Sequence, residues 1–283
     1  MTNHPNSFIS TWFNALSSVS RTEPPIHEEH TQHPIPEERS VTKGDYGEDA
    51  VLLAVIPDPT ARYPRARHGE VGLAEGWAFA DAVMRVVGAD AARDHKRAII
   101  IVIDVPGQAY GYVEELAGIH QSLAAAANAL ATARLAGHPT VGLIVGQAVS
   151  GAFLAVGLQA GRLIALDHDG VVVQVMSKRA AGRITRRTIE EIDDAAKSVP
   201  ATAYDIASFA RLGALHEVLP VDDPQSPTDA DIARVREAID AAVVDLHTSG
   251  DRSLHTRLTS VGAREQRSAS ILVRERIDQQ WEG

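Results

Sequence analysis

The chain has 283 residues, of which 45% are hydrophobic, so it can bury a full core as one large domain or a domain with appendages. Its formal charge of -10 argues against a nucleic-acid partner, because such binding depends on Lys and Arg neutralising phosphates. The absence of cysteine excludes disulfides, thiol nucleophiles and thiolate metal sites. With neither an apolar run of membrane length nor a secretory signal, the sequence predicts a cytoplasmic protein without a membrane partner.

Residues 1–45 are rich in Pro, Glu and His, and their composition predicts a flexible N-terminal segment. Near its start, Phe8, Trp12 and Leu16 recur four residues apart, which predicts a short amphipathic docking helix. His27, His30 and His33 have a spacing that suits a metal ion, but the prolines around them break any helix. A solvated linker is therefore favoured there over a metal site, and no metal is expected.

Residues 46–247 alternate between two kinds of pattern. Short Val, Ile and Leu runs predict strands buried on both faces, at 51–56, 98–104, 140–145, 163–166 and 171–175. Apolar periodicity and capping signals predict helices at 73–87, 113–135, 150–160, 190–197, 203–212 and 229–246. This order is typical of an α/β domain with a parallel sheet. Residues 248–283 are polar and predict a C-terminal tail with one helix around 269–281.

The strand at 98–104 ends in a glycine turn that leads into a helix. Pro106 fixes its own φ, and Gly107 can lie flush against a ligand. The backbone N–H groups of Gln108 and Ala109 are then expected to face that ligand without obstruction. A tight connection between two elements is the alternative interpretation of this turn.

A second turn follows the strand at 140–145, 39 residues after the first. Gly146 is expected to form it, and the small residues Ser150, Gly151 and Ala152 are expected to begin a helix. Unpaired N–H groups and the positive end of the helix dipole favour anions at such helix starts. Close helix packing is an alternative reason for small residues. Together the two turns predict a paired anion-binding site.

The segments IDVPGQAYG (103–111) and RLAGHPTVGLIVGQAVSGAFLAVG (134–157) resemble the carboxyltransferase α subunit of acetyl-CoA carboxylase. They are more similar to the γ-subunit family of biotin-independent malonate decarboxylase, whose Pro-Arg-Ala-Arg, Gly-Glu-Val-Gly and Glu-Gly-Trp segments match 64–67, 69–72 and 75–77. The resemblance covers roughly residues 51–219. It implies a crotonase-like carboxyltransferase domain, a spiral of ββα units.

The resemblance implies two backbone oxyanion holes, one at Gly107 and Gln108 and one at Gly151 and Ala152. Ala152 replaces the glycine usual in carboxyltransferases, which keeps the N–H donor but narrows the pocket. The implied reaction decarboxylates malonyl-S-acyl carrier protein to acetyl-S-acyl carrier protein through an enolate. The implied partners are a β subunit, an acyl carrier protein and an acyl carrier protein transferase. The CoA-like phosphopantetheine group would belong to the carrier, and no cofactor is expected on this chain.

Several side chains are candidates for binding this substrate. Gln108 and Gln147 flank the turns and are suited to hydrogen-bond a carboxylate. Tyr110, with Tyr112, Glu114 and Glu115, is a candidate to supply the proton that quenches the enolate, and the start of a helix is the alternative interpretation. Cationic side chains suit the phosphates of a prosthetic group or an acidic carrier, although surface cations are common. The candidates for substrate binding are Gln147, Ser150, Tyr110, Arg65, Arg67 and Lys178, with Arg179 and Arg183 as further cations.

Other functions share parts of this pattern. A carboxyltransferase subunit of a biotin-dependent acyl-CoA carboxylase is one alternative, but QVMSKRAAG (174–182) replaces that family's Ser-Pro-Glu-Gly segment, which disfavours biotin binding. Ser150 resembles the nucleophile of Clp-type serine proteases, yet Gln174 stands where that family has its histidine base. An enoyl-CoA hydratase is a further alternative within this fold, but the helix-borne glutamates of that family have no recognisable match in this sequence. A non-catalytic scaffold subunit is the remaining alternative.

Overall fold

A computed structural model describes residues 8–17, 41–45 and 50–281 of the chain. Most of the N-terminal segment predicted to be flexible lies outside these residues, as do His27, His30 and His33, so both hypotheses stay predictions. Within the described ranges, none of the helices combines the length and the apolarity needed to cross a membrane.

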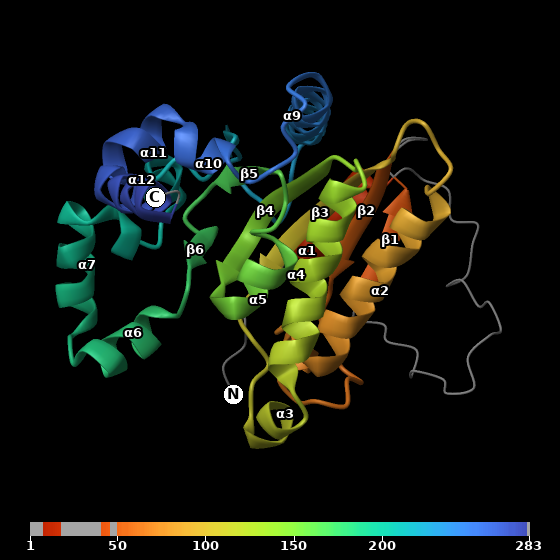
Figure 1. Ribbon diagram of the computed structural model, residues 1–283. Helices are drawn as coiled ribbons and strands as arrows, with labels where there is room; N and C mark the ends of the chain where they lie inside the picture. The colour runs from red at the N-terminus through yellow and green to blue at the C-terminus, as the bar shows by residue number, and fades with distance from the viewer. Residues whose placement is uncertain (1–7, 18–40, 46–49, 282–283) are drawn as a thin grey trace.

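In the described part of the chain, seven strands form one sheet, with the order β1-β2-β3-β4-β5-β7 along the main path (Figure 1). Neighbouring strands are parallel except for β1, which pairs antiparallel with β2 at one edge, so the expectation of a parallel sheet holds for all but this strand. A short strand, β6, pairs with the far end of β4. The strands are β1 (Val41–Asp45), β2 (Ala50–Val55), β3 (Ala98–Val105), β4 (Thr140–Val149), β5 (Arg162–Asp167), β6 (Val172–Gln174) and β7 (Glu217–Pro220).

The helices flank this sheet, and Figure 1 shows α2 and α4 side by side over one face of it. In the same view α6 and α7 lie apart from the sheet, connected to it through β6. The helices are α1 (Ile9–Leu16), α2 (Leu73–Ala89), α3 (Tyr112–Leu116), α4 (Ile119–Leu135), α5 (Ser150–Val156), α6 (Lys178–Thr185), α7 (Ile189–Ser198), α8 (Ile206–Arg211), α9 (Asp229–Thr248), α10 (Thr256–Thr259), α11 (Val261–Gln266) and α12 (Ser268–Trp281), with 3-10 turns η1 (Ala66–His68) and η2 (Pro200–Thr202).

The core is built from the central strands, since every residue of β2 and β3 is buried. Helix α1, the amphipathic segment predicted from its spacing, joins this core by packing on β2, β3, β4 and α9. Its Ile9, Trp12 and Leu16 side chains are fully buried. The indole Nε1 of Trp12 donates to the Pro224 carbonyl at 3.0 Å, and Arg236 donates to the carbonyls at the end of the helix. Helix α1 is therefore an integral part of the domain.

The expected helix at 113–135 is wrong as a single element, because two helices occupy that stretch. Helix α3 ends at Leu116, and α4 begins at Ile119 after Gly118 with a φ of +86°. This left-handed conformation is favourable for glycine and interrupts the helical hydrogen bonds. Helix α8 likewise begins only at Ile206, because the Asp205 side chain accepts the N–H of Ser208 and caps it.

The C-terminal part contains α10, α11 and α12 rather than the single helix expected. Arg257 holds it against the domain, because its guanidinium donates to the carbonyls of Leu158 and Ala160 after α5. Helix α9 continues to Thr248, across the expected boundary at 247. The division of the chain at residues 45 and 247 stays a prediction.

Candidate active site

The first glycine turn lies at the carboxyl end of β3 and is pinned to the segment before α2. The Val71 N–H donates to the Gly107 carbonyl at 3.0 Å, and the Ala109 N–H donates to the Val71 carbonyl at 2.8 Å. The expectation that the Ala109 N–H is free is therefore wrong, because the turn uses it to pair with Val71. Within the described residues, the N–H groups of Gly107 and Gln108 make no hydrogen bond. These two donors remain available to a ligand.

The second turn differs from its prediction, because β4 continues through Gly146 and ends only at Val149. The register between β3 and β4 shifts here, since Ile103 pairs with Ile144 but Val105 pairs with Ala148. Such an irregularity re-aims the strand that carries the extra residues.

Asp104 of β3 fixes this bulge. Its Oδ1 accepts the N–H of Gln147 at 2.8 Å, and its Oδ2 accepts the N–H of Phe8 at 2.9 Å. A Cβ on Gly146 would collide with the Asp104 carboxylate, so glycine is needed for this close approach and not for a turn. Sequence reasoning missed Asp104, although a lone carboxylate at the end of an all-apolar strand is a signal.

Helix α5 begins directly after β4. Val149 is extended, and Ser150 has a φ of +72°, a left-handed conformation that is unfavourable for a residue with a side chain. The N–H groups of the first turn, including those of Gly151 and Ala152, have no acceptor within the helix, and Val149 offers no side-chain cap. The unpaired donors of the first turn of α5 therefore lie at the carboxyl end of β4.

The side chain of Gln108 brings the two turns together. A Cβ built on Gly151 would lie 2.8 Å from Gln108 Oε1, so only glycine leaves room for the amide at this place. Rotating the amide group by half a turn presents its NH₂ donors at this place instead of its oxygen. The amide is thus suited to join the backbone N–H groups in binding an anion.

A cation lies over the rim of the first turn. Arg65 pairs with Glu70 at 2.7 Å, and its guanidinium carbon lies 4.5 Å from the centre of the Tyr110 ring. The hydrogen bond that Arg65 donates to the Glu70 carboxylate is the main reason why the pKa of Arg65 is raised. A Cβ on Gly107 would lie 3.5 Å from Glu70 Oε1, so this ion pair borders the turn. By contrast, Arg67 points elsewhere, since its Nε donates to the Ala61 carbonyl at 2.9 Å.

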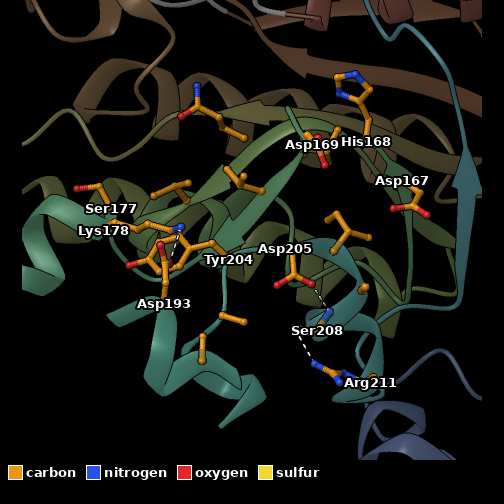
Figure 2. Close-up of a pocket in the computed structure, with 18 of the residues that line it drawn as sticks. Asp167, His168, Asp169, Ser177, Lys178, Asp193, Tyr204, Asp205, Ser208 and Arg211 are labelled. Atoms are coloured by element: carbon orange, nitrogen blue, oxygen red, sulfur yellow. Dashed lines mark hydrogen bonds and ion pairs between the residues drawn. The ribbon is translucent and has the colours of Figure 1, made fainter. Parts of the chain in front are cut away.

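A cavity of about 760 Å³ adjoins the ends of both strands. Lys178 lines it and pairs with Asp193 at 2.7 Å, and Figure 2 shows its ammonium directed over the ring of Tyr204, 5.3 Å from the ring centre. Burial, followed by the charge of Asp193, raises the pKa of Tyr204. Pro106, directly before the first turn, and Gln147 line the same cavity. Lys178 and Gln147 therefore share one space, whereas Arg65 and Tyr110 border the first turn.

The serine protease interpretation finds no support in this geometry. His168 is engaged elsewhere, because its Nδ1 accepts the Gly170 N–H at 2.9 Å and its ring packs edge-on against Phe8. Gln174, at the position of the protease histidine, donates to the Ala203 carbonyl. Across the described parts of the chain, no three His, Asp or Glu side chains are grouped so that they could hold a metal ion.

Backbone donors at the ends of adjacent parallel strands, one set at a helix start, are typical of crotonase-like carboxyltransferase folds. Solved structures of transcarboxylase 12S show the same fold class, since one covers 74% of this chain and 36% of its own with a TM-score of 0.54 at 20% identity. A family model described as the malonate decarboxylase gamma subunit matches residues 66–281. The chain belongs to this family.

Individual relatives agree with this assignment. A chain from a Pseudomonas malonate decarboxylase hetero-tetramer, solved with coenzyme A, is 45% identical and has a TM-score of 0.85, with 98% of this chain and all of that chain covered. A malonyl-S-ACP:biotin-protein carboxyltransferase of Malonomonas rubra is 37% identical over 180 residues, 62% of each protein. An acetyl-CoA carboxylase carboxyltransferase α subunit of Afipia carboxidovorans is 28% identical over 56% of this chain and 48% of its own. The chain thus matches less than two thirds of the length of these last two relatives.

Proposed function

We propose that this chain is the γ subunit of a malonate decarboxylase and that, together with a β subunit of similar fold, it converts malonyl-S-acyl carrier protein to acetyl-S-acyl carrier protein. The observation that carries the proposal is the approach of the Gln108 side chain to Gly151, which supports a shared site for the two sets of backbone donors. The 45% identity to a chain of the Pseudomonas hetero-tetramer supports the same reaction.

The chemistry requires stabilisation of negative charge. When the bond between the α carbon and the carboxylate breaks, carbon dioxide leaves, and the electron pair spreads from the α carbon to the thioester oxygen as an enolate. One pair of N–H groups, at Gly107 and Gln108 or at Gly151 and Ala152, binds this oxygen, and the other pair holds the carboxylate before it leaves. A proton then adds to the α carbon. Losing one such donor costs about 3 kcal/mol or more in other enzymes, so preorganised N–H groups account for a large part of the acceleration.

Side chains complete this site in the proposal. The amides of Gln108 and Gln147 hydrogen-bond the carboxylate, and Ser150, at the start of α5, binds substrate beside them. Arg65, stacked on Tyr110, binds the phosphate-bearing part of the substrate, and Lys178 does so from the cavity. Arg67 has a weaker case, since the Ala61 carbonyl already occupies its Nε.

The rest of the assembly follows from this substrate. The phosphopantetheine group belongs to an acyl carrier protein subunit, a transferase subunit loads malonyl onto it, and no cofactor is bound covalently to this chain. A chain that is 45% identical to this one, with a TM-score of 0.82, comes from a Pseudomonas malonate decarboxylase hetero-dimer, which supports a β partner. The lack of cysteine suits the cytoplasm, where thiols stay reduced.

Release of carbon dioxide from malonyl-carrier tests the proposal, measured with this chain, with its β subunit and with the two together. Activity is expected only from the mixture, because the substrate would lie between the subunits. A stable, well-folded mixture that releases no carbon dioxide would contradict the proposal.

Carboxyl transfer to a biotin protein is the second candidate, favoured by the match to the Malonomonas rubra enzyme. Adding a biotin carrier protein to the mixture distinguishes the two. Carboxylated biotin at the expense of free carbon dioxide would establish the transferase, and unchanged release of carbon dioxide would establish the decarboxylase.

A further inference from the structure

Helix α6 and the turn after it carry a concentration of positive charge on a strongly acidic chain. Five cations fall within ten residues, Lys178, Arg179, Arg183, Arg186 and Arg187, although the formal charge of the whole chain is -10. Figure 1 shows α6 set apart from the main sheet, next to α7. None of the residues in α6 is buried, and the second half of the helix, 183–185, is exposed.

Among the residues that the structure describes, only one of these cations forms an ion pair. Lys178 pairs with Asp193 of α7, while no ion pair within the described part of the chain involves any of the four arginines, all of which are exposed. Arg179 and Arg183 lie one turn apart on the helix and therefore share a face. Like charges placed this close repel one another, so the arrangement disfavours the isolated subunit and favours an anionic partner.

Apolar side chains lie among the arginines. Ile184 is 70% exposed, and Val175 and Ile189 on either side of α6 are 54% and 49% exposed. An apolar contact surrounded by arginines suits a folded protein surface with acidic side chains, because arginine clusters recognise acidic motifs. An extended polyanion such as a nucleic acid would also meet the acidic remainder of the chain, which disfavours it.

The start of α6 lies beside the cavity at the carboxyl ends of β3 and β4. Ser177 and Lys178 line the cavity that is also bounded by Pro106 and Gln147, close to the two sets of backbone donors. A volume of about 760 Å³ lies in the usual range for small-molecule and cofactor sites, roughly 300 to 1,000 Å³. A flexible arm attached to a protein docked on α6 would therefore have a route toward the strand ends.

We propose that α6 and the turn after it form the docking surface for an acidic carrier protein, whose phosphate-linked arm enters the cavity past Lys178. The inference rests on the proposed decarboxylation and adds to it the surface that recognises the carrier. Arg179, Arg183, Arg186 and Arg187 bind acidic side chains of the carrier, and Ile184 packs against its apolar surface.

The test uses the complete assembly with two double variants that each remove two exposed arginines. Arg179→Ala with Arg183→Ala changes the proposed surface. Arg85→Ala with Arg93→Ala changes α2 and the turn after it, which lie near the amino end of β3, away from the site. Release of carbon dioxide is measured with malonyl-carrier and with malonyl-CoA, which lacks the carrier protein, at several salt concentrations.

We expect the α6 variant to raise KM for malonyl-carrier on the order of tenfold and to weaken its salt dependence, with kcat and the malonyl-CoA reaction unchanged. The control variant should match the wild type with both substrates. Equal effects on both substrates would overturn the proposal, as would an unchanged KM or failure of the variant to assemble with the β subunit. An unsubstituted assembly that decarboxylates neither substrate would instead refute the proposed function itself.

Discussion

Replacing Gly151 by alanine separates the catalytic use of this position from its structural use. The new methyl group would lie 2.8 Å from Gln108 Oε1, too close for the amide to stay where it is. Because that atom is the end of a flexible side chain, Gln108 can move away at little cost. The backbone of Gly151 does not require glycine, since its φ lies outside the left-handed region.

The expected effects on stability and activity have opposite signs. Alanine is favoured over glycine within a helix by about 0.5 to 1 kcal/mol, so the variant should be about as stable as the wild type or slightly more stable. Displacing the amide removes the hydrogen bond that Gln108 is proposed to donate to the substrate carboxylate. Such a bond to a charged group contributes typically about 1.5 to 3 kcal/mol, which corresponds to a loss of about ten- to hundredfold in kcat/KM.

Gly88→Ala in α2 is the matched control, because Gly88 is also helical and a Cβ there would meet nothing within 4 Å. It should show the gain in stability without loss of activity. Thermal melting and carbon dioxide release from the assembled complex measure the two quantities. Gln108→Ala should lose a similar share of kcat/KM, and the double variant should lose little more than the larger single effect. Wild-type activity in Gly151→Ala, or a loss explained by unfolding, would refute the reasoning.

Three further outcomes test other parts of the structure. Gly146→Ala should lower the free energy of unfolding by about 1 to 3 kcal/mol in urea denaturation, because its Cβ collides with the Asp104 carboxylate; an unchanged midpoint would contradict this. Trp12→Ala should cost about 3 to 5 kcal/mol in the same assay if α1 belongs to the core, whereas a cost near zero would mean that α1 is dispensable. Burial lowers the pKa of His138 from 6.5, so the folded protein binds fewer protons than the unfolded chain, and stability should fall as pH drops below about 6.5. His138→Asn should reduce this slope between pH 7 and pH 5, and an identical slope would exclude His138 as its source.

The sequence predicts best the strands that are buried on both faces, because such strands must consist mainly of apolar residues. The runs that became β2, β3 and β5 are almost entirely apolar in their middle residues, and their bounds agree with expectation to within about one residue. The two edge strands escaped prediction for a physical reason. Strand β1 reads VTKGD and β7 reads EVLP, and neither short, partly polar run is distinguishable from a loop until a neighbouring strand supplies its hydrogen bonds.

Helix α6 escaped prediction for a related reason. No residue in it is buried, and its apolar positions are Ala180, Ala181 and Ile184, so it lacks the row of large buried side chains that marks helices packed on a core. Its ordered start depends instead on Ser177, whose side chain accepts the Ala180 N–H. A sequence pattern detects the helices that a core requires more readily than a helix presented to a partner.

Some features of the site can be predicted from the sequence, and others depend on the three-dimensional arrangement of the strands. The glycines at 107 and 151 were recognisable because each follows a buried strand and precedes a helix. Two contacts depend on how far β4 continues beside β3. One is the approach of Gln108 to Gly151, and the other is the hydrogen bond from the Gln147 N–H to Asp104. The length of β4 was underestimated because Gly146 looks like a turn when the carboxylate opposite it is unknown.

The extension of β4 connects fold and proposed chemistry. Had the strand ended at Gly146, the start of α5 would follow the bulge directly, with no segment to receive β6. Because Asp104 holds the bulge, β4 continues to Val149, and the left-handed Ser150 then turns the chain into the helix. A strained conformation persists only where its surroundings fix it, and here one carboxylate of β3 fixes the strand on which the turn depends. Asp104 thus holds in place the strand that leads to Gly151 and Ala152, which in the proposed mechanism face the substrate together with Gly107 and Gln108.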